Sequence, residues 1–136
     1  MLPEPSAAAH VRRAAQSLGK ATRIVTSPAA TGGWASPGDL DRTLADVIQL
    51  SSRLSGLLDE AGAWLERCAR EGLLRDDRGL ATGQTLTGAV GALARAVGDC
   101  RTLTGDLDDA CRHTTHLAAA MPGLAASLSA SKEDPR

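Results

Sequence analysis

The residues most able to do chemistry lie close together near the end of the chain, in the sequence DACRHTTH. Asp109, His113 and His116 are spaced by four and three residues, which places them on one face of a helix. A carboxylate and two imidazoles are suitable ligands for Zn²⁺. The HExxH pattern of zinc enzymes is absent, and histidines near the end of a helix are also favoured by its dipole. We therefore name these three residues as metal candidates but expect no bound metal or cofactor.

The cysteines are a second group with reactive side chains. Cys68, Cys100 and Cys111 are too few and too scattered for a disulfide framework. Cys100 and Cys111 would lie about 16 Å apart along one helix, too far for a disulfide. Cys68 and Cys100 fall on apolar positions and are predicted to be small core residues. We expect three free thiols, which are typical of a reducing compartment.

Positive charge is concentrated near the start of the chain, where four basic residues occur without an acidic one. Such a helix could contact phosphate groups, so DNA binding is kept as an alternative function. The whole chain has a net charge of −1, however, and therefore no overall field that attracts nucleic acid. The helix also lacks the bulky side chains of a membrane-inserting helix, so we expect no membrane contact. The basic residues are Arg12, Arg13, Lys20 and Arg23.

No other pattern indicates catalysis. The sequence contains neither a phosphate-binding glycine loop nor a dinucleotide-binding glycine motif, and no serine has a recognisable His/Asp pair. We therefore expect a protein that binds another protein and is not an enzyme. A metal-dependent enzyme that uses His113 and His116 ranks third, after the DNA-binding alternative.

Composition indicates which elements must position these residues. The 136-residue chain is 43% hydrophobic but only 1% aromatic, and it is rich in Leu and Ala, which favour helices over strands. Its length suits one domain. No apolar run approaches the roughly 20 residues that span a bilayer, and the first residues do not resemble a secretory signal. A cytoplasmic protein is expected.

Three helices are predicted, at about residues 6–27, 37–72 and 82–121. They form one domain over residues 1–123, followed by a flexible tail at 124–136. The second and third helices carry apolar residues at heptad spacing and are joined by about ten residues, so they must fold back into an antiparallel hairpin. We expect the Leu seam of the second helix to form its core-facing side. This seam comprises Leu40, Leu44, Val47, Leu50, Leu54, Leu57, Ala61, Trp64 and Cys68.

A stripe of small residues runs beside each Leu seam. Each glycine inside a helix costs about 1 kcal/mol relative to alanine, so a regular series requires an explanation. Either the Ala-rich first helix packs closely on the stripe, or a second subunit or foreign helix uses it. The stripe consists of Gly91, Gly98 and Gly105 on the third helix and of Ser55, Gly62 and Ala69 on the second.

The predicted fold is therefore all-α: a long antiparallel hairpin with the shorter first helix packed on it as a three-helix bundle. Because the first helix cannot cover the whole hairpin, apolar surface is left for a partner. We expect a coiled-coil-like adaptor, regulator or assembly subunit that mediates protein–protein interaction and self-associates into an oligomer. The predicted partner-binding residues are Gly91, Gly98, Gly105 and Trp34, the last of which either anchors its loop or contacts the partner.

Overall fold

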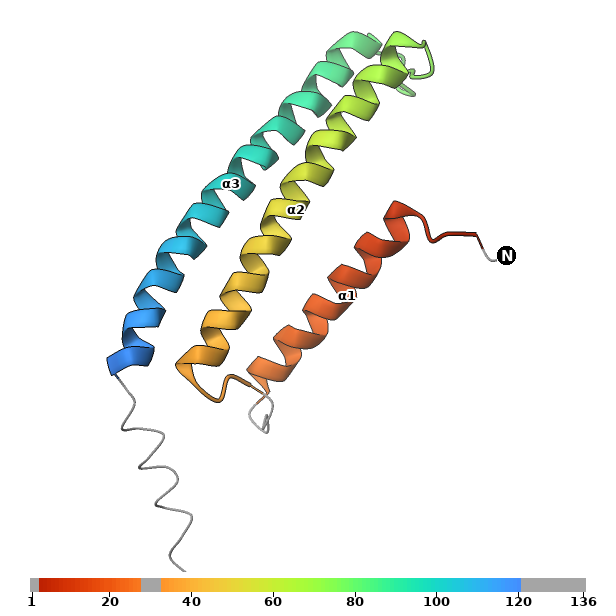
Figure 1. Ribbon diagram of the computed structural model, residues 1–136. Coiled ribbons are helices and arrows are strands. Elements are labelled where there is room, and N and C mark those ends of the chain that lie inside the picture. Colours follow the sequence, from red (N-terminus) through yellow and green to blue (C-terminus); the bar gives the residue numbers. More distant parts are fainter. Residues whose placement is uncertain (1–2, 28–32, 121–136) are drawn as a thin grey trace, which may run out of the picture.

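The computed structural model describes residues 3–27 and 33–120, which form helices and the segments that connect them (Figure 1). Its elements are α1 (Ala7–Thr26), α2 (Pro37–Arg70) and α3 (Thr82–Ala120). The described residues contain no strand. The all-α fold class is confirmed, and the predicted helix bounds differ from the observed ones by at most two residues. The predicted tail at 124–136 lies outside the described residues.

Local signals in the sequence explain where α2 begins and ends. The Ser36 side chain accepts a hydrogen bond from the Asp39 backbone N–H at 3.2 Å, as expected of an N-cap. At the other end Gly72 has a φ of +70°, and the Leu73 N–H donates to the Cys68 carbonyl at 2.9 Å. Glycine adopts this left-handed conformation at no steric cost, so it can terminate the helix in a Schellman motif.

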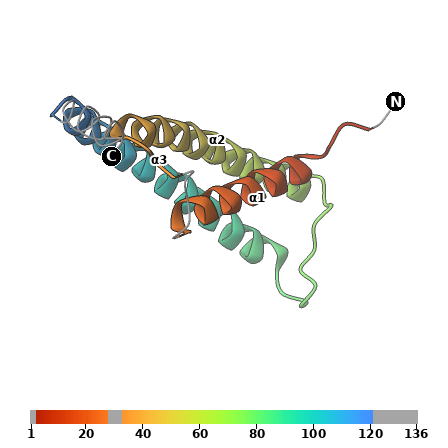
Figure 2. The same cartoon turned by 90° about the horizontal axis from the view of Figure 1, so that it is seen from below.

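The predicted hairpin is confirmed, because α2 and α3 pack side by side along their length. The turn that joins them and the end of α3 lie at opposite ends of this hairpin (Figures 1 and 2). The Ser51 hydroxyl donates to the Cys100 carbonyl at 3.0 Å, and Thr104 donates to Ser51 at 3.1 Å. These two hydrogen bonds join the middle of α2 to the middle of α3.

The side of α2 that faces α3 differs from the prediction. Its buried residues are the small ones, Ser51, Ser55 and Gly62, together with Cys68 near the turn. Four members of the predicted Leu seam are instead substantially exposed: Leu50 (40%), Leu54 (42%), Leu57 (40%) and Trp64 (53%). The prediction that this seam forms the core-facing side of α2 is therefore wrong for these four residues, whereas Cys68 is buried and the remaining seam residues, Leu40, Leu44, Val47 and Ala61, are half-buried.

Close packing explains this difference. The seam of α3 supplies the large side chains of the interface; Val97 is buried and Leu93 half-buried. A Cβ atom placed on Gly62 would lie 4.0 Å from a terminal methyl of Leu93, so that methyl already occupies the space beside the glycine. One helix buries one stripe against one neighbour. Because the small stripe lets the two helices approach closely, it faces α3, and the Leu seam of α2 is turned outward.

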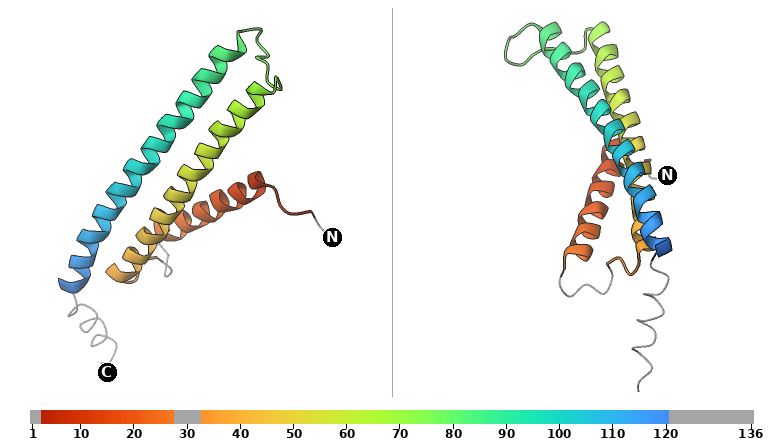
Figure 3. Two further views of the ribbon diagram at one scale, coloured as in Figure 1. Left: turned by 45° about the horizontal axis from the view of Figure 1, so that its top comes forward. Right: turned by 90° about the vertical axis from the view of Figure 1, so that its left-hand side faces the viewer.

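The predicted packing of α1 on the hairpin is also wrong. No α1 residue is buried, and Val11 and Leu18 are 45% and 51% exposed. In the left view of Figure 3, the N-terminal end of α1 points away from the hairpin. The small residues of α2 that were expected to receive α1, Ser55 and Gly62, are already covered by α3.

The assignment of the two glycine environments predicts opposite effects of the same substitution. Gly62→Leu should lower the free energy of unfolding by about 1–3 kcal/mol, because the added side chain meets Leu93. Gly98→Leu is the matched control. Nothing lies within 4 Å of its Cβ position, so it should be neutral or stabilising by up to about 1 kcal/mol through helix propensity. Chemical denaturation followed by circular dichroism measures both. A larger loss in Gly98→Leu would show that the helix faces are assigned incorrectly.

Candidate functional site

The structure does not bring the predicted metal ligands together around a common point. Asp109, His113 and His116 are all exposed on α3, and the Asp109 carboxylate lies 3.3 Å from the Arg112 guanidinium. In the residues that the structure describes, no three or more His, Cys, Asp or Glu side chains are grouped so that they could hold a metal ion. The described residues therefore provide no metal centre for the predicted third-ranked enzyme.

The cysteines match the expectation of free thiols. Cys68 is buried, and Cys100 and Cys111 are half-buried. Burial raises the pKa of the Cys111 thiol, and the negative charges of Asp41 and Asp108 raise it further. A raised pKa disfavours the thiolate, which is the nucleophilic form of cysteine. Cys111 therefore lacks the environment of a catalytic nucleophile.

The basic residues of α1 are accessible. Arg12, Arg13, Lys20 and Arg23 are all exposed, and every ion pair in the described residues lies between two residues of the hairpin. Their charges are thus available to a negatively charged partner.

The predicted glycine stripe of α3 is not covered by another helix of the described chain. Nothing lies within 4 Å of a Cβ placed on Gly98 or Gly105, and Gly91 has only the Arg95 guanidinium nearby, at 3.7 Å. Packing against α1 therefore does not explain the stripe. A partner at these three glycines stays a prediction.

A different surface, formed by large apolar side chains, is the strongest candidate for a functional site. On α2, Leu50, Leu54, Leu57 and Trp64 follow one another at spacings of four, three and seven residues, which aligns them along one side of the helix. On α3, Leu103 and Leu117 are 47% and 56% exposed. We call these six residues the apolar face.

Helical periodicity places the α2 and α3 parts of the apolar face on the same side of the hairpin. Leu40 and Leu117 line one cleft at the end where α2 begins. Leu54 lies two heptads after Leu40, and Leu103 lies two heptads before Leu117. Positions seven residues apart keep the same orientation toward a packed neighbour, so Leu54 and Leu103 also share a side. The apolar face therefore extends along the hairpin.

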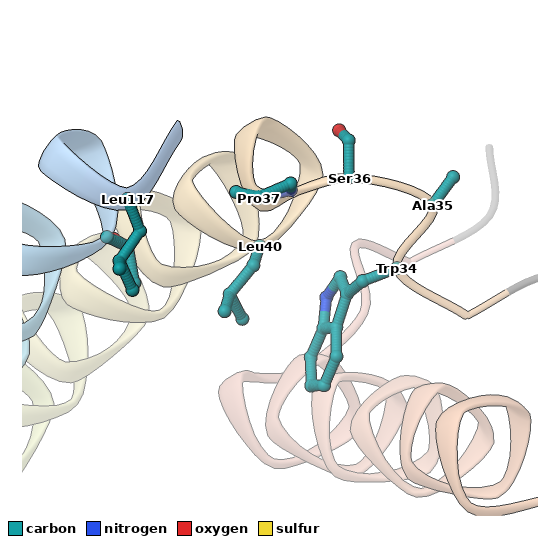
Figure 4. Close-up of a pocket in the computed structure, with 7 residues that line it drawn as sticks. Trp34, Ala35, Ser36, Pro37, Leu40 and Leu117 are labelled. Carbon is teal, nitrogen blue, oxygen red and sulfur yellow. The ribbon is translucent and has the colours of Figure 1, made fainter. Parts of the chain in front are cut away.

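The cleft at the end of this face has a volume of about 350 Å³ and includes Trp34. Figure 4 shows the side chains of Trp34, Leu40 and Leu117 pointing to the same side, away from the hydroxyl of Ser36. The Trp34 indole N–H donates to the Thr43 hydroxyl at 3.0 Å, yet half of the residue stays exposed. Trp34 is thus anchored to α2 and lengthens the apolar face.

Carboxylates tie the two ends of the hairpin. At one end Asp41 of α2 accepts hydrogen bonds from Thr114 and Thr115 of α3, and these bonds lower the pKa of Asp41. At the other end Asp76 accepts hydrogen bonds from Arg78 and Thr85, which lower the pKa of Asp76; only 1% of its side chain is exposed. Both ends of the platform that carries the apolar face are therefore fixed.

Sequence reasoning named most residues of the apolar face but assigned them to the core, and it missed the two carboxylate ties. The relevant signal is the small stripe at Ser51, Ser55 and Gly62, which competes with the Leu seam for the inner side of α2. Periodicity identifies both stripes but does not decide which one faces α3.

None of the described helices combines the length and apolar character needed to cross a membrane. Comparison of the chain with models of protein families, with curated proteins and with solved structures finds no match. The site must therefore be interpreted from its own chemistry.

The carboxylate ties predict how stability depends on pH. The pKa values of Asp41 and Asp76 are lower in the folded state than the ordinary value of 3.8, so their contribution is present above that value and is lost as the pH falls below it. Asp41→Asn/Asp76→Asn should melt at a lower temperature than wild type at pH 7, and the difference should shrink toward pH 2.

Asp46→Asn/Glu60→Gln provides the control for thermal melts followed by circular dichroism. These two exposed acids of α2 form no ion pair or side-chain hydrogen bond in the described structure. If the control variant loses as much melting temperature with the same pH dependence, Asp41 and Asp76 do not stabilise the hairpin more than other acidic residues do.

Proposed function

We propose that this chain is a non-enzymatic interaction protein that self-associates through the apolar face and serves as an adaptor, a regulator or an assembly subunit. The observation that carries the proposal is the distribution of apolar side chains in the described residues. Among the large hydrophobic residues, only Val97 is buried, with Cys68 as a smaller companion, whereas six residues of α2 and α3 form an exposed face.

A pair of helices has a single interface, which buries one stripe from each helix. When a helix carries a second apolar stripe, that stripe stays exposed. A stable domain normally packs every apolar stripe against another element. Here α2 uses its small stripe against α3, and its Leu seam remains without a neighbour. Large apolar side chains that lie exposed on one side of a helix often mark a partner site. A third layer of helices, supplied by another chain, would complete the bundle.

Energetics favour a symmetric partner. Removing the remaining exposed area of each large side chain from water contributes roughly 1 kcal/mol. The six residues of one apolar face therefore contribute about 6 kcal/mol. A two-fold dimer buries this face on both copies, which doubles the contribution to about 12 kcal/mol. That gain is comparable with the cost of lost translational and rotational freedom, estimated at about 4–15 kcal/mol. Self-association is therefore attainable, and further contacts would strengthen it.

The three free thiols support a reducing compartment such as the cytosol as the place where this assembly acts. No role beyond binding is needed to account for the apolar face.

Adding charge to the apolar face should dissociate the assembly. Leu54→Glu/Leu57→Glu places two carboxylates where we expect a partner helix, and the dimer dissociation constant should rise at least 100-fold because buried unpaired charges are costly. Gln49→Glu/Ser52→Glu adds the same charge at two other exposed positions of α2 and should associate like wild type. Size-exclusion chromatography with light scattering measures the mass. Equal masses for the two variants, or a monomeric wild type, would reject the apolar face as the interface.

Exposed cations on α1 favour DNA binding as the second candidate function. A DNA-binding protein would show fluorescence anisotropy with a labelled duplex that falls steeply with added salt, and Arg12→Glu/Arg13→Glu would abolish the signal. The interaction proposal predicts no binding at physiological salt, because the chain as a whole is not basic. Salt-dependent binding that requires Arg12 and Arg13 would favour the alternative.

A further inference from the structure

A regular series of charged residues flanks the exposed apolar residues of α2. Each member lies three or four residues from Leu50, Leu57 or Trp64, so the series follows one flank of the apolar face. This flank points away from α3. Ser51, which is buried against α3, lies about 100° around the helix from Leu50 in one direction, whereas Arg53 lies about 60° in the other. The series, which alternates in sign every seven residues, consists of Asp46, Arg53, Glu60 and Arg67.

These four charges have no partner within the described chain. All four side chains are exposed, and the ion pairs of the described residues involve other groups. The positions three and four residues from Arg53 and Glu60, which are their neighbours on the helix, carry no charge. The series is therefore available to another chain.

The alternation makes the series complementary to itself when two copies of α2 run antiparallel. Asp46 and Arg67 have the same midpoint as Arg53 and Glu60, between residues 56 and 57. A two-fold axis at this midpoint places Asp46 of each copy opposite Arg67 of the other, and Arg53 opposite Glu60. Each contact occurs twice, so every charge of the series is paired with an opposite one.

Other arrangements of the two helices bring like charges together. A parallel pair in register places each residue opposite its own counterpart, so all four contacts are repulsive. A shift of the antiparallel pair by one heptad places Arg53 opposite Arg53 and Asp46 opposite Glu60, or Glu60 opposite Glu60 and Arg53 opposite Arg67. Charges beside an apolar stripe select the orientation and register of paired helices in this way.

The apolar residues of α2 fit the same axis. Along the helix, Leu54 and Leu57 lie within about 4 Å of the midpoint, so these residues of the two copies meet at the centre. Leu50 and Trp64 lie about 10 and 11 Å from the midpoint on opposite sides. Trp64 of each copy therefore reaches the level of Leu50 of the other.

We infer that two copies of the chain associate through antiparallel α2 helices, with Arg53 opposite Glu60 and Asp46 opposite Arg67 across the two-fold axis. This inference rests on the proposed self-association and adds the helix, the orientation and the register. Because Leu103 and Leu117 of α3 lie on the same side of the hairpin, the second hairpin also approaches them. The result is an assembly in which α2 and α3 of both copies form a four-helix core.

Reversal of the inner charges tests the register in the full-length chain. Arg53→Glu and Glu60→Arg each bring like charges together at two symmetric contacts, so the dimer dissociation constant of each variant should rise roughly 10-fold. Arg53→Glu/Glu60→Arg restores opposite charges at both contacts and should dimerise like wild type. An equimolar mixture of the two single variants should form a heterodimer with nearly wild-type affinity for the same reason. Sedimentation velocity over a concentration series measures each association.

Arg95→Glu is the matched control for net charge. It changes the charge of the chain as Arg53→Glu does, at an exposed residue of α3 that forms no ion pair in the described structure, and it should dimerise like wild type. An equal loss of affinity in this control would overturn the register. A combined variant that dimerises no more tightly than the single variants would also overturn it.

Thermal melts at a concentration well below the dissociation constant separate the dimer from the fold of one chain. Since the four charged residues form no ion pair within the described chain, their substitution should leave the melting temperature of the monomer unchanged. A lower melting temperature would assign the series to the fold of one chain and overturn the inference. Single variants that dimerise as tightly as wild type would reject the inference alone, whereas a monomeric wild type would reject the proposed function as well.

Discussion

The close approach of α2 and α3 along a stripe of small residues determines the rest of this structure. Ser51, Ser55 and Gly62 leave space for the larger side chains of α3, and the Ser51 hydroxyl joins the two helices through the Cys100 carbonyl and Thr104. Small residues at a helix interface permit close backbone approach, and the Ser51 hydroxyl makes its hydrogen bonds within the pair. Asp41 and Asp76 then fix the two ends of the hairpin.

This packing turns the most apolar side of α2 outward. Since a helix buries only one stripe against one neighbour, the use of the small stripe leaves Leu50, Leu54, Leu57 and Trp64 for another element. The hairpin is therefore closely packed between α2 and α3 but incomplete as a bundle, because no third layer of helices covers these side chains in the described structure. We propose that this incompleteness is the functional property of the protein: a rigid platform that binds further helices.

Much of the architecture could be predicted from the sequence, because it depends on local signals. Ser36 and Gly72 mark the ends of α2, and heptad spacing identifies both long helices and the hairpin. The direction in which each stripe faces depends on nonlocal packing. Gly62 reveals its role only when Leu93 lies beside it, and the exposure of α1 follows only when the small stripe of α2 is covered by α3. The residues of the apolar face could be identified from the sequence, but their heptad spacing is also typical of a buried core, so their exposure could not be predicted.

The central claim is that the apolar face is covered by a second copy of the chain. Sedimentation equilibrium of the wild-type protein from about 1 to 100 μM tests it most directly, since this range corresponds to a net association free energy of about −8 to −5.5 kcal/mol, which a gain of about 12 kcal/mol provides when the cost of association is near the lower end of its range. The account predicts a mass that rises from that of one chain, 14.0 kDa, toward twice that value. A constant mass of 14.0 kDa over the whole range would contradict it.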